Sequence, residues 1–104
     1  MATEIHTTSI VDKKAAIDED VVIGPFSIIG SGATIRKGTK IISHVVIEGK
    51  TEIGEECTVY PFTSIGLPPQ DLKYRNEETG VRIGNKNIIR EYTTIHRASV
   101  GGSG

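Results

Sequence analysis

An aliphatic residue recurs at every sixth position over most of this 104-residue chain. Counting from residue 5, every sixth position as far as residue 65 holds isoleucine or valine, and isoleucine returns in the same register at positions 83, 89 and 95. Four residues after each aliphatic comes a second class of mostly small side chains, such as Ser27, Ala33 and Cys57. This period matches neither the 3.6 residues of an α-helix nor the two-residue alternation of a flat strand.

A six-residue period suits short strands joined by tight turns, with one large and one small side chain per strand directed into a narrow interior. Three hexads make one triangular coil, and coils stack at about the 4.7–4.9 Å spacing of hydrogen-bonded strands. We therefore expect an all-β fold, a parallel β-helix of hexapeptide repeats with about five coils. The periodicity does not set the winding hand. A stack this short has a thin core, and both of its end coils need covering.

The period breaks once, between residues 66 and 82. This stretch contains Pro68 and Pro69, which lack the amide hydrogens of a central sheet ladder, and then a run of polar and charged residues. The register survives the break, because positions 65 and 83 are three periods apart. We expect one domain, with hexad coils at 1–65 and 83–99 and an external loop at 66–82. Binding groups are often placed on such a loop, and a tolerated surface insertion is the alternative.

Composition excludes several function classes. The net charge is −1 with scattered Lys and Arg, so the chain has no electrostatic footprint for nucleic acid. No apolar run has the length of a membrane span and no signal-peptide pattern opens the chain, so we expect a cytoplasmic protein. Three unclustered histidines and one cysteine predict no metal site, and no cofactor motif is present. Cys57 falls in a small inward position, where we expect a buried, unreactive thiol.

Four segments carry a resemblance to a known family. They are IGPFSIIG at 23–30, SHVVIEG at 43–49, QDLKY at 70–74 and IGNKNIIREYTTIHR at 83–97. In this order they resemble the N-terminal part of the acyl-[acyl-carrier-protein]–UDP-N-acetylglucosamine O-acyltransferases, which catalyse the first step of lipid A synthesis. The resemblance implies a left-handed winding, an exception to the right-handed crossover rule. It also implies a homotrimer with sites between subunits, with acyl carrier protein and UDP-N-acetylglucosamine, or its 3-amino analogue, as partners.

The same resemblance assigns substrate-binding residues. It places Gln70, Asp71 and Lys73 in the substrate-contacting loop and His96 near the sugar nucleotide. Asp71 can accept hydrogen bonds from sugar hydroxyls, and Lys73 can offer a positive charge to the diphosphate or to the reacting carbonyl. His96 directly follows inward-facing Ile95, so alternation places it outside the coil. His44 is expected to be structural, and His6 to face solvent.

The family's catalytic histidine lies in a coil beyond the end of this chain, and no histidine here matches its motif. We therefore name no catalytic residue, and we expect the 104-residue chain to lack acyl transfer on its own because the C-terminal coils and helical domain are absent. A non-catalytic β-helix module for assembly or binding is the alternative. Another hexapeptide acyltransferase is a weaker third reading, which QDLKY disfavours.

Overall fold

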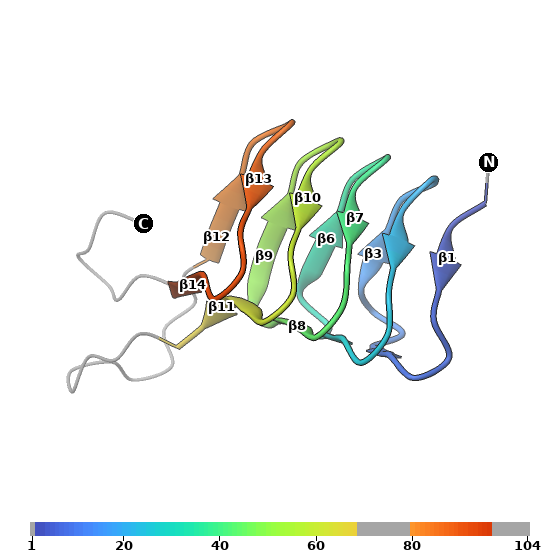
Figure 1. Cartoon of the computed structure of the whole chain (residues 1–104), viewed down its shortest axis with the longest axis horizontal. Helices are drawn as coiled ribbons and strands as arrows, with labels where there is room; N and C mark the ends of the chain where they lie inside the picture. Colours follow the sequence, from blue (N-terminus) through green and yellow to red (C-terminus); the bar gives the residue numbers. More distant parts are fainter. Residues whose placement is uncertain (1, 69–79, 97–104) are drawn as a thin grey trace.

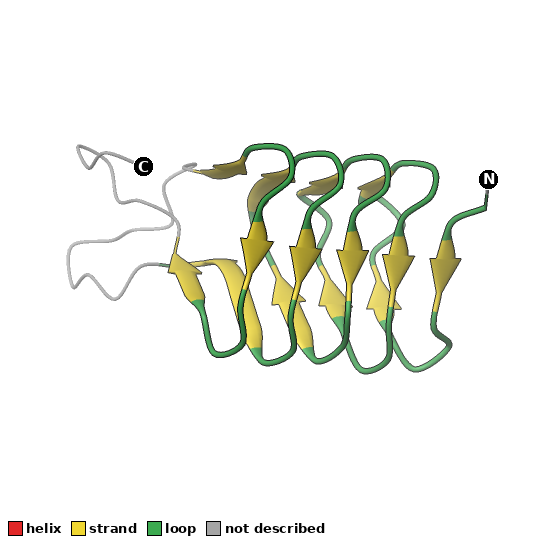
Figure 2. Cartoon of the chain, turned by 45° about the horizontal axis from the view of Figure 1, so that its top comes forward, coloured by secondary structure: helices red, strands yellow, loops and turns green. Residues whose placement is uncertain are grey.

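The computed structural model describes residues 2–68 and 80–96, and all regular structure in this part of the chain is β-strand. The strands form three parallel sheets that wind as the faces of a triangular prism, one coil stacked on the next (Figures 1 and 2). No helix that is long and apolar enough to cross a membrane occurs in these two ranges.

The chain visits the three sheets in turn. Sheet A contains β1 (Glu4–Ile5), β4 (Val22–Ile23), β7 (Lys40–Ile41), β10 (Thr58–Val59) and β13 (Ile88–Ile89). Sheet B contains β2 (Ile10–Val11), β5 (Ile28–Ile29), β8 (Val45–Ile47), β11 (Thr63–Leu67) and β14 (Thr94–His96). Sheet C contains β3 (Ala16–Ile17), β6 (Ala33–Ile35), β9 (Lys50–Ile53) and β12 (Gly80–Ile83).

Strand pairing confirms three hexads per coil. Ile23 pairs with Ile41 across sheet A and Ile29 with Ile47 across sheet B, and in both pairs the partners are three periods of the repeat apart. Across the break the partners are five periods apart, as in the pairing of Ile65 with Ile95. The sequence across the break is therefore two periods longer than one coil, and the repeat has the same register on both sides.

The predicted aliphatic series lines the interior. Between residues 23 and 65 each of its members is at most 1% exposed, and the thiol-bearing Cys57 is as buried as they are. Ile5 departs from the expectation and is 45% exposed. It lies in the first coil, which has a neighbouring coil on one side only. The thin core is complete in the middle of the stack and open at this end.

Buried hydroxyls in the small positions link consecutive coils. Thr39 Oγ1 donates to the Gly54 carbonyl at 2.7 Å and accepts from the Cys57 amide at 3.1 Å. Ser27 Oγ likewise accepts from the amide of Val45, one coil further on. These backbone groups lie at corners, where a buried amide or carbonyl needs a side-chain partner. A small side chain with a hydroxyl both fits the corner and supplies that partner.

At two of the three corners of the prism, most turns use left-handed backbone at the residue three positions before an aliphatic. Seven non-glycine residues there have φ between 52° and 62°, namely Asp20, Phe26, His44, Glu56, Phe62, Lys86 and Tyr92. Such a conformation is uncommon outside glycine. Hydrogen bonds between coils hold it in place, as where the Phe62 amide donates to the His44 carbonyl at 3.0 Å. The turn geometry leaves these side chains on the outside of the prism.

The predicted loop boundaries are too wide. The sequence predicts a loop at 66–82, but β11 extends to Leu67 and β12 begins at Gly80. The sheets continue because partner strands are available on both sides: Leu67 pairs with His96, and Val81 pairs with Thr51. Val81 occupies the small position two residues before Ile83, so the repeat resumes earlier than the aliphatic series alone indicates. Residues 69–79 lie outside the described residues.

Candidate functional site

The ends of the break are held by two different sheets. The chain leaves from β11, which pairs with β8 and β14 in sheet B, and returns in β12, which pairs with β9 in sheet C. Gln70, Asp71 and Lys73, the predicted substrate-binding residues of the loop, lie outside the described residues. The rigid stack therefore fixes where this segment begins and ends.

His96, the fourth predicted site residue, lies at the start of the break. Its side chain is exposed, as alternation from Ile95 predicts. The ring Nδ1 lies 3.1 Å from the carbonyl oxygen of Pro68. The structure thus brings His96 to the last described residue before the predicted binding segment.

A shallow depression of about 340 Å³ lies on sheet C beside Gly80, where the chain returns. Its rim carries Lys50, Glu52 and Arg82. Arg36 Nη2 lies 2.9 Å from Glu52 Oε2, and Arg82 Nε lies 3.4 Å from Glu52 Oε1. The hydrogen bond from Arg36, helped by the charges of both guanidinium groups, holds the pKa of the Glu52 carboxyl below its usual range. Glu52 pairs with both guanidinium groups, so its single carboxylate offsets one of the three positive charges of Lys50, Arg36 and Arg82.

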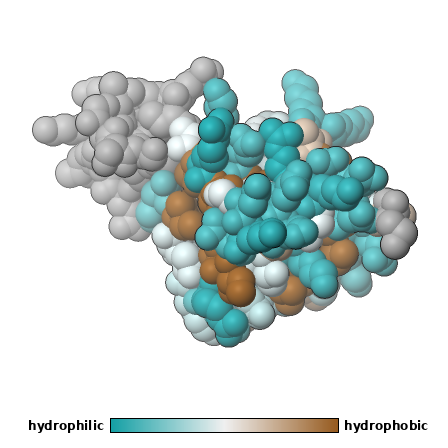
Figure 3. Space-filling model, turned by 90° about the horizontal axis from the view of Figure 1, so that it is seen from above, coloured by the Kyte–Doolittle hydropathy of each residue, from teal (hydrophilic) through white to brown (hydrophobic). Residues whose placement is uncertain are grey.

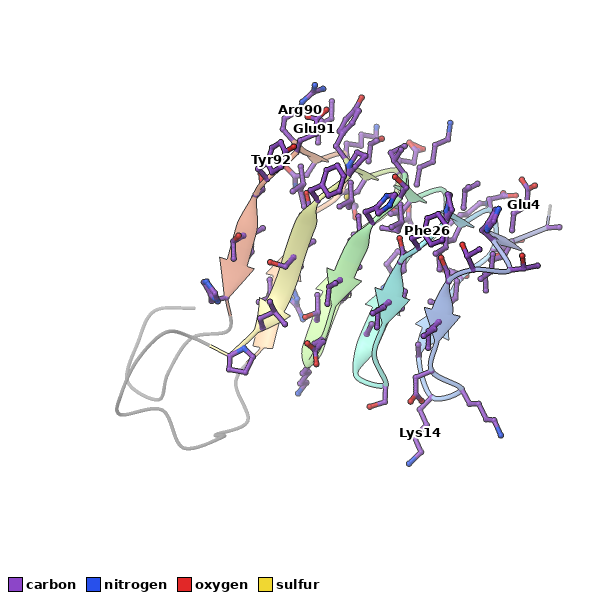
Figure 4. All side chains as sticks on the ribbon, turned by 60° about the horizontal axis from the view of Figure 1, so that its bottom comes forward. Glu4, Lys14, Phe26, Arg90, Glu91 and Tyr92 are labelled. Carbon is purple, nitrogen blue, oxygen red and sulfur yellow. The ribbon has the colours of Figure 1, made fainter. Side chains whose placement is uncertain are left out.

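The corner between sheets A and B carries a column of rings that the sequence analysis does not predict. Phe26, His44, Phe62 and Tyr92, here called the aromatic corner, stack along the prism axis with ring centroids 5.2, 5.0 and 5.5 Å apart. Phe26 and Tyr92 mark the two ends of this row in Figure 4. Between 54% and 79% of each of Phe26, Phe62 and Tyr92 is exposed. The expected structural role of His44 takes the form of a ring packed between two phenyl groups.

A step of one whole coil, three periods of the repeat, is the signal that could have revealed this column. Positions 26, 44 and 62 follow one another at that step, and Tyr92 comes after the same step lengthened by the two extra periods of the break. In the adjoining sheet B, the outward residue directly before each aliphatic is also uncharged: Ile10, Ile28, Val46, Ser64 and Thr94. Together the aromatic corner and this row form a strip without acidic or basic residues apart from His44.

The corner between sheets C and A is different. Its turn positions hold Asp20, Gly38, Glu56 and Lys86, here called the charged corner. Hydrophilic side chains cover much of the described surface on this side (Figure 3).

The described residues contain no group of three or more His, Cys, Asp or Glu side chains that could hold a metal ion.

The structure places all three histidines. His6 is exposed, as expected, with Nδ1 at 2.9 Å from Thr8 Oγ1, and His44 Nδ1 lies 3.0 Å from Ser43 Oγ. The third histidine, His96, contacts the carbonyl oxygen of Pro68. None of these three contacts is the pairing with a carboxylate that commonly orients a catalytic histidine.

Comparisons with known proteins match nearly all of the chain. An acyl-[acyl-carrier-protein]–UDP-N-acetylglucosamine O-acyltransferase of Thermodesulfovibrio yellowstonii is 63% identical over 101 residues, which are 97% of this chain and 39% of that protein. No family model matches the chain.

Solved structures agree. The UDP-N-acetylglucosamine O-acyltransferase of Moraxella catarrhalis superimposes with a TM-score of 0.88 at 47% identity, over 93% of this chain and 38% of that one. The UDP-N-acetylglucosamine acyltransferase of Francisella novicida gives 0.91 at 37% identity, over 96% and 37%. These folds are left-handed β-helices, which confirms the expected hand. The chain spans about two fifths of the length of these relatives. By sequence and by fold it belongs to the UDP-N-acetylglucosamine O-acyltransferase family, of which it represents the N-terminal part.

Proposed function

We propose that this chain supplies the N-terminal β-helix of an enzyme that transfers a 3-hydroxyacyl chain from acyl carrier protein to the 3-hydroxyl of UDP-N-acetylglucosamine, the first step of lipid A synthesis. The observation that carries the proposal is the match of 63% identity over 97% of the chain to a protein of that name. The alternative acceptor for the same acyl transfer is the 3-amino analogue of UDP-N-acetylglucosamine. A cytoplasmic location belongs to the same proposal.

Within this reaction we assign the loop residues to the sugar nucleotide. Asp71 would accept hydrogen bonds from sugar hydroxyls, Gln70 would offer an amide, and Lys73 would place a positive charge at the diphosphate or the reacting carbonyl. Acyl transfer also needs a general base for the acceptor proton and a donor for the oxyanion. None of the histidine contacts described above suits that base, so we assign it to sequence beyond these 104 residues.

We also propose a homotrimer that uses the uncharged strip as its contact between copies. Phe62 is 54% exposed and Tyr92 79%, although both are large and apolar. Exposed apolar strips of this kind mark interaction surfaces. A second copy is the partner that repeats the same coil spacing along its whole length, and the lack of charge removes like-charge repulsion between identical surfaces.

The test of the substrate assignment uses a fused protein. Residues 1–104 are joined, at the end of the matched region, to the remainder of the Thermodesulfovibrio yellowstonii relative, and acyl transfer to UDP-N-acetylglucosamine is followed. Asp71→Ala and Lys73→Ala should each lower kcat/KM by about tenfold or more, because each removes a charged contact. Glu77→Ala and Glu78→Ala remove charge from the same loop outside the QDLKY motif, and should change kcat/KM less than about threefold. Equal losses in all four variants would contradict the assignment.

A non-catalytic β-helix module for assembly or binding is the second candidate, because none of the three described histidine contacts is with a carboxylate. In that case the fused protein would fold and assemble but would transfer no acyl group to UDP-N-acetylglucosamine. The transfer assay therefore separates the two.

A further inference from the structure

The strand that leads into the break ends in an irregularity. β11 pairs with β14 at Ser64–Thr94 and Ile65–Ile95, and then the register shifts so that Leu67 lies opposite His96. Gly66 is the extra residue, with φ of +85°, and a Cβ at this position would collide with the Glu48 carbonyl oxygen. A bulge of this kind redirects the strand that carries it.

His96 contacts the chain immediately after this bulge. Its Nδ1 lies 3.1 Å from the Pro68 carbonyl oxygen. A carbonyl oxygen can only accept, so in this hydrogen bond the ring nitrogen is the donor and the neutral ring carries its hydrogen on Nδ1. Pro68 has no amide hydrogen of its own to fix its orientation through the sheet. The histidine therefore holds the one backbone polar group by which this residue can be anchored.

We propose that His96 is a positioning residue, which sets the direction in which the chain leaves the stack toward Gln70 and Asp71 by donating a hydrogen bond from Nδ1 to the Pro68 carbonyl. The change in KM that this inference predicts rests on the proposed function. The hydrogen bond itself rests only on the described contact between His96 and Pro68, where β11 pairs with β14. It differs from direct contact with the sugar nucleotide, the role that resemblance assigns to this histidine. Nδ1 faces the chain's own backbone, and only Nε2 is left as the acceptor of the neutral ring.

The first test is independent of activity. A two-bond 1H–15N correlation spectrum of the 15N-labelled 104-residue chain reports which ring nitrogen carries the hydrogen. We expect the Nδ1–H form for His96, which is the minor form of free neutral histidine. An Nε2–H form would overturn the proposal, whether or not the protein transfers acyl groups.

The second test compares two amide substitutions in the fused protein. The side-chain nitrogen of His96→Asn occupies the place of Nδ1, whereas that of His96→Gln reaches the place of Nε2. We expect His96→Asn to keep KM for UDP-N-acetylglucosamine within about threefold. His96→Gln and His96→Ala should raise it about tenfold with kcat little changed, as when one hydrogen bond that positions a binding group is lost. Rescue by Gln and not by Asn would show direct substrate contact, and equal effects of all three would show a merely structural role; either result overturns the proposal.

The two tests separate the possible failures. If the wild-type fused protein transfers no acyl group, the proposed function fails while the ring spectrum still decides the hydrogen bond. If transfer is normal and the spectrum shows Nε2–H, the positioning role fails while the proposed function stands.

Discussion

Two corners of the prism share one backbone geometry and present opposite surfaces. At both, the residue three positions before an aliphatic adopts left-handed φ, 53° at Glu56 and 62° at Phe62. One corner carries charged side chains, and the other carries three exposed aromatic rings and a histidine. The turn itself requires neither set. The six-residue repeat therefore determines what faces inward, while the outward positions are free to be adapted to association and binding.

The largest expected effect comes from placing a charge in the aromatic corner. Phe62→Glu should raise the dissociation constant between copies about 100-fold or more, because an unpaired carboxylate would be buried in the contact. Lys86→Glu adds a carboxylate at the same turn geometry in the charged corner and should leave association within about threefold. Sedimentation velocity over a range of concentrations measures both. Continued association of Phe62→Glu, or equal dissociation of both variants, would contradict the contact surface.

A smaller effect is expected in the interior that both corners share. Thr39→Val removes the hydroxyl that bonds the Gly54 carbonyl and the Cys57 amide, and leaves both groups buried without it. The free energy of unfolding should fall by about 1–3 kcal/mol. Thr58→Val makes the same change on an outward position of sheet A and should alter it by less than about 0.5 kcal/mol. Urea unfolding at a fixed protein concentration compares the stability of the two variants. A larger loss from Thr58→Val would contradict the role of the buried hydroxyls in linking consecutive coils.

Loss of ring stacking alone should have a moderate effect. His44→Asn keeps a side chain that tolerates left-handed backbone but removes the ring between Phe26 and Phe62. The expected cost is about 1 kcal/mol. Lys86→Asn has the same backbone requirement without a ring stack and is the matched control. Thermal unfolding should show a lower Tm for His44→Asn only, and an equal fall in both would assign the effect to the turn.

The smallest effect concerns the ion pairs on sheet C. Because Arg36 and Arg82 lower the pKa of Glu52, the carboxylate form contributes stability above its ordinary pKa of 4.5, and this contribution is lost as pH falls through the lowered value. Glu52→Gln should therefore lower Tm slightly at pH 7, and the difference from wild type should vanish in acid. Added salt should reduce it as well, since both guanidinium groups are exposed and Glu52 is only half-buried. A difference that grows toward acid would contradict the sign.

The inward half of the fold can be predicted from the sequence because the pattern is local: a position every six residues must be apolar to fill the prism. The aromatic corner cannot be found in the same way. Its turn position is solvent-exposed, and single-period steps visit the three corners in turn, so they mix its aromatic residues with residues such as Asp20 and Glu56. Steps of one whole coil, which is three hexads, separate the three corners. The aliphatic series misses Val81 because this residue occupies the small position two residues before Ile83, where it pairs with Thr51. Gln70, Asp71 and Lys73 obey no period and are assigned by resemblance alone.

Acyl transfer by the fused protein tests the central claim most directly. Residues 1–104, joined to the remainder of the Thermodesulfovibrio yellowstonii relative, are incubated with 3-hydroxyacyl carrier protein and UDP-N-acetylglucosamine, beside the 104-residue chain alone. We expect the fused protein to form the 3-O-acyl sugar nucleotide and the chain alone to form none, because loss of a general base removes about 10²–10⁴-fold of the rate. A fused protein that folds and associates but transfers nothing would contradict the proposed function. Transfer by the 104-residue chain alone would contradict the claim that its base lies elsewhere.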